Sequence, residues 1–354
     1  TLGITTRLRF RLVEQPPHDS LVVAYMDDVV ASSEAVFQIL PMGPSGIEVM
    51  DKSLLNVAKA NDPSLAAALP ADLDHLLLIE FDGPDAAACA SQARQVQDLL
   101  KKGGYTQRAY SAVTLEEKER FWTVRKAAVP ILHKLRGRKK ILALVEDAAV
   151  PIENLAGFYR GIYEVMGRHG VDFVIVGHIA KGLLHTRPLL DLKDAENVRL
   201  LKRIADDYYL MVQALGGTVS GEHGDGRLRS AYIKRRYPDI YPLFLKIKEL
   251  LDPRGLLNPE IITHHDPDQM MKALRYGSAY RTHEPEPPLL EWPERFATEI
   301  EKCHGCSKCA TVTTATRMCP VFKFTRREAA TPKAKANVLR TLISGGLDSR
   351  ELYT

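Results

Sequence analysis

The 354-residue sequence has few cysteines, few aromatic residues and no long apolar run. No hydrophobic stretch approaches the roughly 18 residues that a membrane-spanning helix needs, so the sequence predicts none. The formal net charge is only +4, and the basic runs at residues 134–140 and 234–236 are short. Such runs are typical of solvated helix ends and do not indicate a nucleic-acid surface. With 45% hydrophobic and 26% charged residues, the chain is typical of a globular protein of two or three domains.

Four of the five cysteines lie close together near the C-terminal end. Cys303, Cys306 and Cys309 have the x2 spacing that opens an iron–sulfur motif, and Cys319, followed by proline, would close it. The gap before Cys319 is longer than the three residues found in bacterial ferredoxins. The clustering favours a 4Fe-4S cluster in a reducing compartment, with a zinc knuckle as the alternative to the cluster.

Apolar patterning predicts alternating strands and helices through most of the chain. We expect strands at residues 8–12, 21–26, 46–50, 75–81, 141–145 and 171–176. We expect helices at residues 32–40, 84–102, from 114 onward, 153–168, 195–215 and 332–343. The pattern favours an α+β fold in which helices cover one face of an antiparallel sheet. A proline-rich linker at residues 265–292 and a small, mainly α-helical segment at residues 293–354 follow.

Two glycine-flanked motifs carry the candidate chemistry. Glu222 and His223 are adjacent in the Ser-Gly-Glu-His-Gly-Asp-Gly stretch at residues 220–226. His178 and His185 are seven positions apart, which on a straight strand would place them on opposite faces. Gly182 offers a turn or bulge that would bring both rings to one point.

The residue types suit a divalent metal such as zinc. His178, His185 and the carboxylate of Glu222 are the candidate ligands, with an open position for a substrate oxygen. His223 is then the candidate base, because a neutral imidazole accepts a proton near pH 7. Arg125 is the candidate anchor for a substrate carboxylate, because a guanidinium binds such a group with two hydrogen bonds. Arg187, two residues past His185, is a second candidate cation.

These motifs resemble the C-terminal part of FAD-linked oxidases of the vanillyl-alcohol oxidase type, which include D-lactate, glycolate and D-2-hydroxyglutarate dehydrogenases. The resemblance is carried by residues 178–185 and 220–226, by Phe121-Trp122-x-x-Arg125, and by Leu-Asp-Pro-Arg-Gly-Leu-Leu-Asn-Pro at residues 251–259. The cysteine segment resembles large members that carry a ferredoxin-like module.

The resemblance implies a cap domain with a ferredoxin-like antiparallel sheet and a divalent ion, zinc or manganese, at His178, His185 and Glu222. His223 would be the base and Arg125 would hold the carboxylate of a small 2-hydroxy acid. Hydride would pass to FAD, and electrons would leave through the iron–sulfur centre to an acceptor that the sequence does not identify.

The resemblance also implies a domain arrangement. Residues 1–10 resemble the end of an FAD-binding domain, residues 11–264 the cap, and residues 293–354 the start of an iron–sulfur module. FAD contacts are expected at Gly3 and Asn258. We therefore expect a fragment that binds FAD weakly or not at all, whose partners are the rest of the FAD domain and of the iron–sulfur portion. The expected location is cytoplasmic, with peripheral membrane association through the electron acceptor.

The sequence departs from the family pattern at two positions. Lys181 stands where an acid is common and Leu183 where asparagine is common, which puts the contacts around the ligands in question. Two other functions stay open. One is a zinc hydrolase that uses the same histidines and Glu222. The other is a non-catalytic electron-transfer or docking module built on the cysteines.

Overall fold

The computed structural model describes residues 3–61, 63–132, 135, 137–264, 266–272, 274–283, 291–292, 294–313, 318–348 and 350. Parts of the expected basic run and linker, including residues 134, 136 and 284–290, lie outside the described residues. The chain divides into two compact units, Thr1–Arg275 and Tyr276–Thr354. The division falls within the stretch expected as a linker, residues 265–292.

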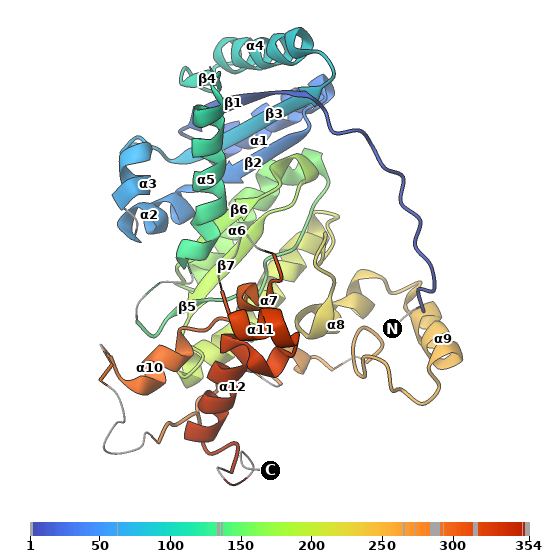
Figure 1. Ribbon diagram of the computed structural model, residues 1–354. Helices are drawn as coiled ribbons and strands as arrows, with labels where there is room; N and C mark the ends of the chain where they lie inside the picture. The colour runs from blue at the N-terminus through green and yellow to red at the C-terminus, as the bar shows by residue number, and fades with distance from the viewer. Residues whose placement is uncertain are drawn as a thin grey trace. The chain divides into compact units, whose positions relative to one another are not determined.

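The first unit is built on a seven-stranded sheet in the order β4-β1-β3-β2-β6-β7-β5 (Figure 1). The strands are β1 (His18–Met26), β2 (Gly46–Met50), β3 (His75–Gly83), β4 (Ala109–Ala112), β5 (Lys140–Ile141), β6 (Phe173–Gly177) and β7 (His185–Leu190). Every neighbouring pair is antiparallel. The first four strands have the order of a ferredoxin-like fold, with a helix after β1 and after β3 as in that fold and two further helices between β2 and β3. The other three strands extend the sheet beyond β2.

Helices pack on both faces of this sheet. The helices of the first unit are α1 (Val29–Ile39), α2 (Lys52–Asn61), α3 (Pro63–Ala68), α4 (Ala86–Lys102), α5 (Leu115–Leu132), α6 (Leu155–Arg168), α7 (Ala195–Ala214), α8 (Gly226–Arg236) and α9 (Tyr241–Leu251). Val22 and Ala24 of β1 join the core formed with α1, α4, α6 and α7. Leu21 and Val23 join the other core, with α2 and α5. The α+β fold class is confirmed. The expectation that helices cover only one face of the sheet is wrong, because consecutive residues of β1 are apolar and both faces of the sheet are buried.

Two other expectations about strands need correction. Residues 8–12 form no strand, and Leu8, Phe10 and Leu12 are 67%, 75% and 89% exposed. The alternation of apolar and basic residues gives a strand only where a neighbour supplies hydrogen bonds, and the described residues pair no segment with this one. The strand expected at 141–145 is reduced to Lys140–Ile141, with an isolated bridge at Val145.

A buried polar cluster fixes the end of β2 on the face covered by α6. Asp51 accepts hydrogen bonds from His75 Nε2 at 3.0 Å, from the Tyr159 hydroxyl at 3.1 Å and from the Tyr163 hydroxyl at 2.9 Å. Asp51 is 0% exposed and His75 is 2% exposed. Burial opposes ionisation of Asp51, but the hydrogen bond from His75 and those from Ser53 outweigh it and lower the pKa of this carboxyl.

The second unit is small and helical in its described residues, which contain no strand. It comprises α10 (Phe296–Glu301), α11 (Pro320–Thr325) and α12 (Pro332–Ile343). Ala297, Ile300 and Ile343 form its core. Thr331 caps α12 by accepting a hydrogen bond from the Ala334 N–H. No helix in the described part of the chain is both long and apolar enough to cross a bilayer.

Candidate metal and substrate site

The turn between β6 and β7 brings two histidines together. His178 directly follows β6, and His185 is the first residue of β7. Between them lie a 3-10 turn, η3 (Ile179–Lys181), and Gly182 at φ +64°. A Cβ on Gly182 would lie 2.1 Å from the Val150 carbonyl oxygen, so only glycine fits. The two imidazole centroids are 5.4 Å apart, which confirms the expected role of Gly182 in the turn.

Glu222 and His223 lie in the loop between α7 and α8, which Asp147 holds in place. Asp147 is 0% exposed and accepts hydrogen bonds from the Ser220 hydroxyl, from the His223 N–H at 2.9 Å and from the Glu222 N–H at 3.2 Å. The Gly221 N–H donates to the Asp147 carbonyl oxygen at 2.6 Å. Burial of Asp147 favours the neutral acid, but the hydrogen bonds outweigh it and lower the pKa of this carboxyl. Asp147 is therefore an ionised anchor for the loop.

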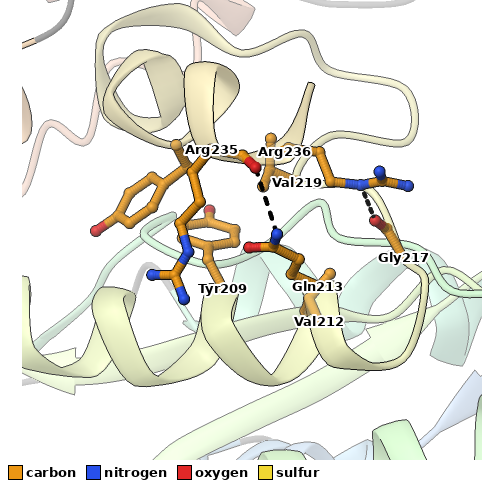
Figure 2. Close-up of a pocket in the computed structure, with 8 residues that line it drawn as sticks. Tyr209, Val212, Gln213, Gly217, Val219, Arg235 and Arg236 are labelled. Atoms are coloured by element: carbon orange, nitrogen blue, oxygen red, sulfur yellow. Dashed lines mark hydrogen bonds between the residues drawn. The ribbon is translucent and has the colours of Figure 1, made fainter. Parts of the chain in front are cut away.

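Two hydrogen bonds at the base of the same loop join α8 to the loop and to α7, as Figure 2 shows. Arg236 of α8 donates from Nε to the Gly217 carbonyl oxygen at 2.5 Å. The Gln213 side chain of α7 donates to the Arg235 carbonyl oxygen at 3.3 Å. The cavity between the two helices has a volume of only about 10 Å³, at the lower limit of what holds one water molecule. The junction therefore gives the loop a fixed starting point.

Three imidazoles converge on one carboxylate oxygen. The Nε2 atoms of His178, His185 and His223 lie 3.5, 3.3 and 3.4 Å from Glu222 Oε1. The rings of His185 and His223 are stacked, with centroids 5.1 Å apart and planes 9° apart. His185 is the buried member, with a side chain 7% exposed, whereas the side chains of His178 and His223 are 32% and 42% exposed. The cluster therefore opens to solvent on the side of these two histidines.

Each imidazole has a partner at its other nitrogen. The Nδ1 atom of His178 lies 2.5 Å from Glu48 Oε1, and that of His185 lies 2.6 Å from the Glu146 carbonyl oxygen. For His223, Nδ1 lies 3.3 Å from Glu146 Oε1. These acceptors favour the tautomers that carry the proton on Nδ1, which leaves the Nε2 lone pairs directed toward Glu222.

The surroundings shift the pKa values of His178 and His185 in opposite directions. Burial lowers the pKa of His185, which keeps that ring neutral. The hydrogen bond to Glu48 raises the pKa of His178. Burial of Glu48 opposes its ionisation, but the bonds from His178 and Arg125 outweigh burial and lower the pKa of its carboxyl. Glu48 is therefore an anion beside the His178 ring.

Both expected substrate cations lie at this site, each beside a carboxylate. Arg125 of α5 donates from Nε to Glu48 Oε2 at 2.9 Å, and its Nη2 lies 2.8 Å from the same oxygen. Arg187 of β7 forms an ion pair with Glu146, with Nη2 2.6 Å from Oε2. Both arginine side chains are 16% exposed. Their contact with a substrate carboxylate stays a prediction.

The residues fit a tetrahedral divalent ion. Bonds of about 2.0–2.1 Å from zinc to nitrogen or oxygen place neighbouring ligand atoms about 3.3–3.4 Å apart. The separations of 3.5 and 3.3 Å between Glu222 Oε1 and the Nε2 atoms of His178 and His185 agree with these edges. Asp147, His185, Glu222 and His223 also offer ligand atoms that lie within 4.8 Å of one another. Asp147 is already an acceptor for the loop, so His178, His185 and Glu222 stay the better ligand set, and the fourth position of a tetrahedral ion is left open.

The cysteines lie in the second unit, around its short helices. Cys303 follows α10, Cys309 is buried in the turn η5 (Lys308–Ala310), and Cys306 is exposed. Cys319 precedes α11 at φ +45°, and its Sγ accepts a hydrogen bond from the Phe322 N–H at 3.4 Å. All four are free thiols. Their ligation of a cluster stays a prediction.

The two residues expected at FAD are exposed. Gly3 lies in the extended N-terminal segment, and Asn258 has a left-handed backbone at φ +46°. Their contact with FAD also stays a prediction. The two family departures differ in position, because Lys181 is exposed and Leu183 is only 2% exposed. A Cβ on Gly221 would meet Leu183 Cδ1 at 2.5 Å, so Leu183 packs against the loop that carries Glu222.

Sequence reasoning missed three acidic residues that support the histidines: Glu48, Glu146 and Asp147. A signal was present in each case. Glu48 is a charged residue inside the apolar strand β2, and Glu146 and Asp147 are adjacent acids beside buried Val145. Acids in such positions are seldom buried without a partner.

Comparisons with known proteins identify the family of the chain. The family model for the C-terminal domain of FAD-linked oxidases matches residues 15–262. This match covers more than half of the chain, and the chain therefore belongs to that family.

Curated relatives with this similarity include bacterial dehydrogenases and an oxidase subunit. D-2-hydroxyglutarate dehydrogenase of Pantoea ananatis is 31% identical over 85% of this chain and 31% of its own length. The enzyme of that name in Escherichia coli K12 is 28% identical over 99% of this chain and 36% of its own. The glycolate oxidase subunit GlcD of Escherichia coli K12 is 30% identical over 73% of this chain and 50% of its own. The chain spans about a third of the length of the dehydrogenases it matches.

A solved structure shows the same fold at low identity. p-Cresol methylhydroxylase superposes with a TM-score of 0.52 and 15% identity, over 70% of this chain and 53% of that one. The similarity supports the fold.

Proposed function

We propose that this chain is the metal- and substrate-binding part of an FAD-linked dehydrogenase that oxidises a small 2-hydroxy acid. The observation that carries the proposal is the convergence of three imidazole Nε2 atoms on Glu222 Oε1 at 3.3 to 3.5 Å. The names of the relatives, D-2-hydroxyglutarate dehydrogenase and glycolate oxidase subunit, point to the substrate class.

Each residue has a role in this proposal. His178, His185 and Glu222 would hold the divalent ion, zinc or manganese. The ion, when bound, would polarise the substrate hydroxyl and lower its pKa. His223, the most exposed of the three histidines, would take the hydroxyl proton on Nε2 while Glu146 holds its Nδ1 side. Arg125 and Arg187 would draw the substrate carboxylate to the site.

The oxidation releases two electrons and two protons from the hydroxy acid as it becomes the 2-oxo acid. FAD, when bound, would accept the hydride from the α-carbon. Asn258 and Gly3 are the proposed contacts with FAD. Cys303, Cys306, Cys309 and Cys319 are the proposed ligands of a 4Fe-4S cluster that would pass the electrons on. In this proposal, residues 1–10 belong to an FAD domain, 11–264 to the cap, 265–292 to a linker and 293–354 to an iron–sulfur module.

Calorimetric titration of the purified chain tests the substrate class without FAD. The zinc-loaded and metal-free chains are titrated with D-2-hydroxyglutarate, D-lactate and glycolate. The matched controls are glutarate, propionate and acetate, which lack the hydroxyl. We expect at least one hydroxy acid to bind about 10-fold more tightly than its control, a free energy of about 1.4 kcal/mol, and only when metal is present.

Equal affinity for each hydroxy acid and its control would contradict the proposal. Turnover of p-nitrophenyl acetate by the zinc-loaded chain, lost on His223→Ala, would favour the hydrolase instead. If a full-length enzyme that contains this chain keeps full turnover with His178→Ala and His185→Ala, the docking module would be favoured.

A further inference from the structure

The carboxylate of Glu48 joins two groups that have separate roles in the proposed function. Its Oε1 lies 2.5 Å from His178 Nδ1, on the imidazole that would bind the ion. Its Oε2 accepts from Arg125 Nε at 2.9 Å and lies 2.8 Å from Arg125 Nη2. One oxygen thus contacts the proposed metal ligand His178, and the other contacts Arg125, the arginine proposed to bind the substrate carboxylate. The Glu48–Arg125 ion pair uses Nε and Nη2 of the guanidinium and leaves Nη1 outside it.

The position of Glu48 in the fold makes this arrangement rigid. Glu48 lies in β2, which is hydrogen-bonded to β3 on one side and to β6 on the other. Val49 is paired with Gly177, so the backbone of Glu48 runs beside the point where His178 leaves β6. The Glu48 side chain is 15% exposed. A partly buried carboxylate with an arginine on one oxygen has little freedom to turn away from the imidazole on the other.

We propose that Glu48 is a positioning residue that sets the tautomer and orientation of His178 and, through its other oxygen, the orientation of Arg125. The inference rests on the proposed function and adds a residue that joins ion binding to substrate binding. With the proton of His178 held on Nδ1 by Glu48, the Nε2 lone pair is available to the ion. The Oε2 contacts hold the Arg125 fork in one plane, which fixes the direction of the donors left for a substrate carboxylate.

A similar but looser arrangement lies on the other side of the cluster. Glu146 places Oε1 3.3 Å from His223 Nδ1 and Oε2 2.6 Å from Arg187 Nη2. His185 is held instead by the backbone carbonyl oxygen of Glu146, which no side-chain substitution removes. Of the side chains that contact these imidazoles at Nδ1, Glu48 therefore makes the shortest contact and holds a proposed ligand.

Cobalt titration of the full chain, followed by visible absorption, tests this role. Co²⁺ is a spectroscopic probe for zinc sites, and its absorption reports the number and orientation of imidazole ligands. We expect Glu48→Gln to weaken Co²⁺ binding about 10–100-fold, the usual range for loss of a carboxylate behind a ligand histidine, and to alter the absorption. His178→Ala removes the proposed ligand itself, so its loss of Co²⁺ affinity is the largest that Glu48→Gln could cause through His178.

Two further variants separate positioning from general damage. Glu80→Gln is the matched control, because Glu80 lies on the neighbouring strand β3, in a position where burial raises the pKa of its carboxyl. It should keep the Co²⁺ affinity of the parent. Glu48→Asp retains the carboxylate but shortens the side chain, and its affinity should lie between those of the parent and Glu48→Gln. The unfolding midpoint of each metal-free variant is measured in parallel.

Parent-like Co²⁺ affinity and absorption in Glu48→Gln would overturn the inference. If that variant does not fold, parent-like affinity and absorption in Glu48→Asp would overturn it, whereas weakened binding by a folded Glu48→Asp supports it. A parent chain that binds no Co²⁺ at its histidines would remove the proposed function, and this inference with it. A parent that binds Co²⁺ independently of Glu48 would leave the proposed function standing.

Discussion

Removal of the Asp147 carboxylate should destabilise the chain and disorder the metal site together. In Asp147→Ala, the Ser220 hydroxyl and the N–H groups of Glu222 and His223 lose one charged acceptor. A hydrogen bond to a charged group contributes about 1.5–3 kcal/mol, so three bonds set an upper limit of about 5–9 kcal/mol. The side chains of Glu222 and His223 are 35% and 42% exposed, so water can reach the released loop. We therefore expect a loss of about 3 kcal/mol.

Urea unfolding monitored by circular dichroism measures this loss. Asp147→Asn keeps one acceptor oxygen and should lose only about 1 kcal/mol. The control is Asp172→Ala, whose side chain is 77% exposed and pairs with Lys139, and its change should stay within about 0.5 kcal/mol. Zinc affinity should fall in Asp147→Ala, because the loop that carries Glu222 is no longer held. If Asp147→Ala loses less than about 0.5 kcal/mol of its free energy of unfolding and binds zinc as tightly as the unsubstituted chain, Asp147 does not hold the loop.

Three other predictions follow from the structure. Gly182→Ala should lose more free energy of unfolding than Gly104→Ala in thermal or urea unfolding: both glycines have positive φ, but only the Cβ at 182 meets a backbone oxygen, at 2.1 Å. Equal losses would show that the turn relaxes. The lowered pKa of Asp51 contributes stability that is present above the unfolded value of about 3.9 and is lost as pH falls through the folded value. Urea unfolding between pH 6 and pH 2 should thus show an acid-induced loss that Asp51→Asn reduces, and an unchanged pH slope in that variant would contradict this. Anaerobic reconstitution with iron and sulfide should give visible absorbance that Cys309→Ser lowers without a change in zinc content, and an unaltered spectrum would exclude Cys309 as a ligand.

The main features of the fold and the histidine pairs could be predicted because their signals are local. Glycine at 182 marks the turn that unites His178 and His185, and apolar runs mark the central strands. The supporting acids could not be placed, because Glu48 is 130 positions from His178 and Asp147 is 75 positions from Glu222. Such contacts depend on the register of a sheet and the path of a loop, which local patterns do not specify.

The failed strand at residues 8–12 has a related cause. Alternation of apolar and basic residues describes one strand, but a strand also needs a partner, and the structure pairs this segment with nothing among the described residues. The expectation of helices on one face only is wrong for a physical reason: a run such as Leu21–Ala24, buried at every position, indicates a strand with both faces covered.

His178, His185 and Glu222 should together bind one divalent ion. Elemental analysis of the purified chain, with His178→Ala and Cys309→Ser measured beside it, is the decisive test. We expect one zinc or manganese ion per chain, retained in Cys309→Ser and lost in His178→Ala. A chain without a divalent ion after zinc or manganese loading, or an ion lost only in the cysteine variant, would contradict it.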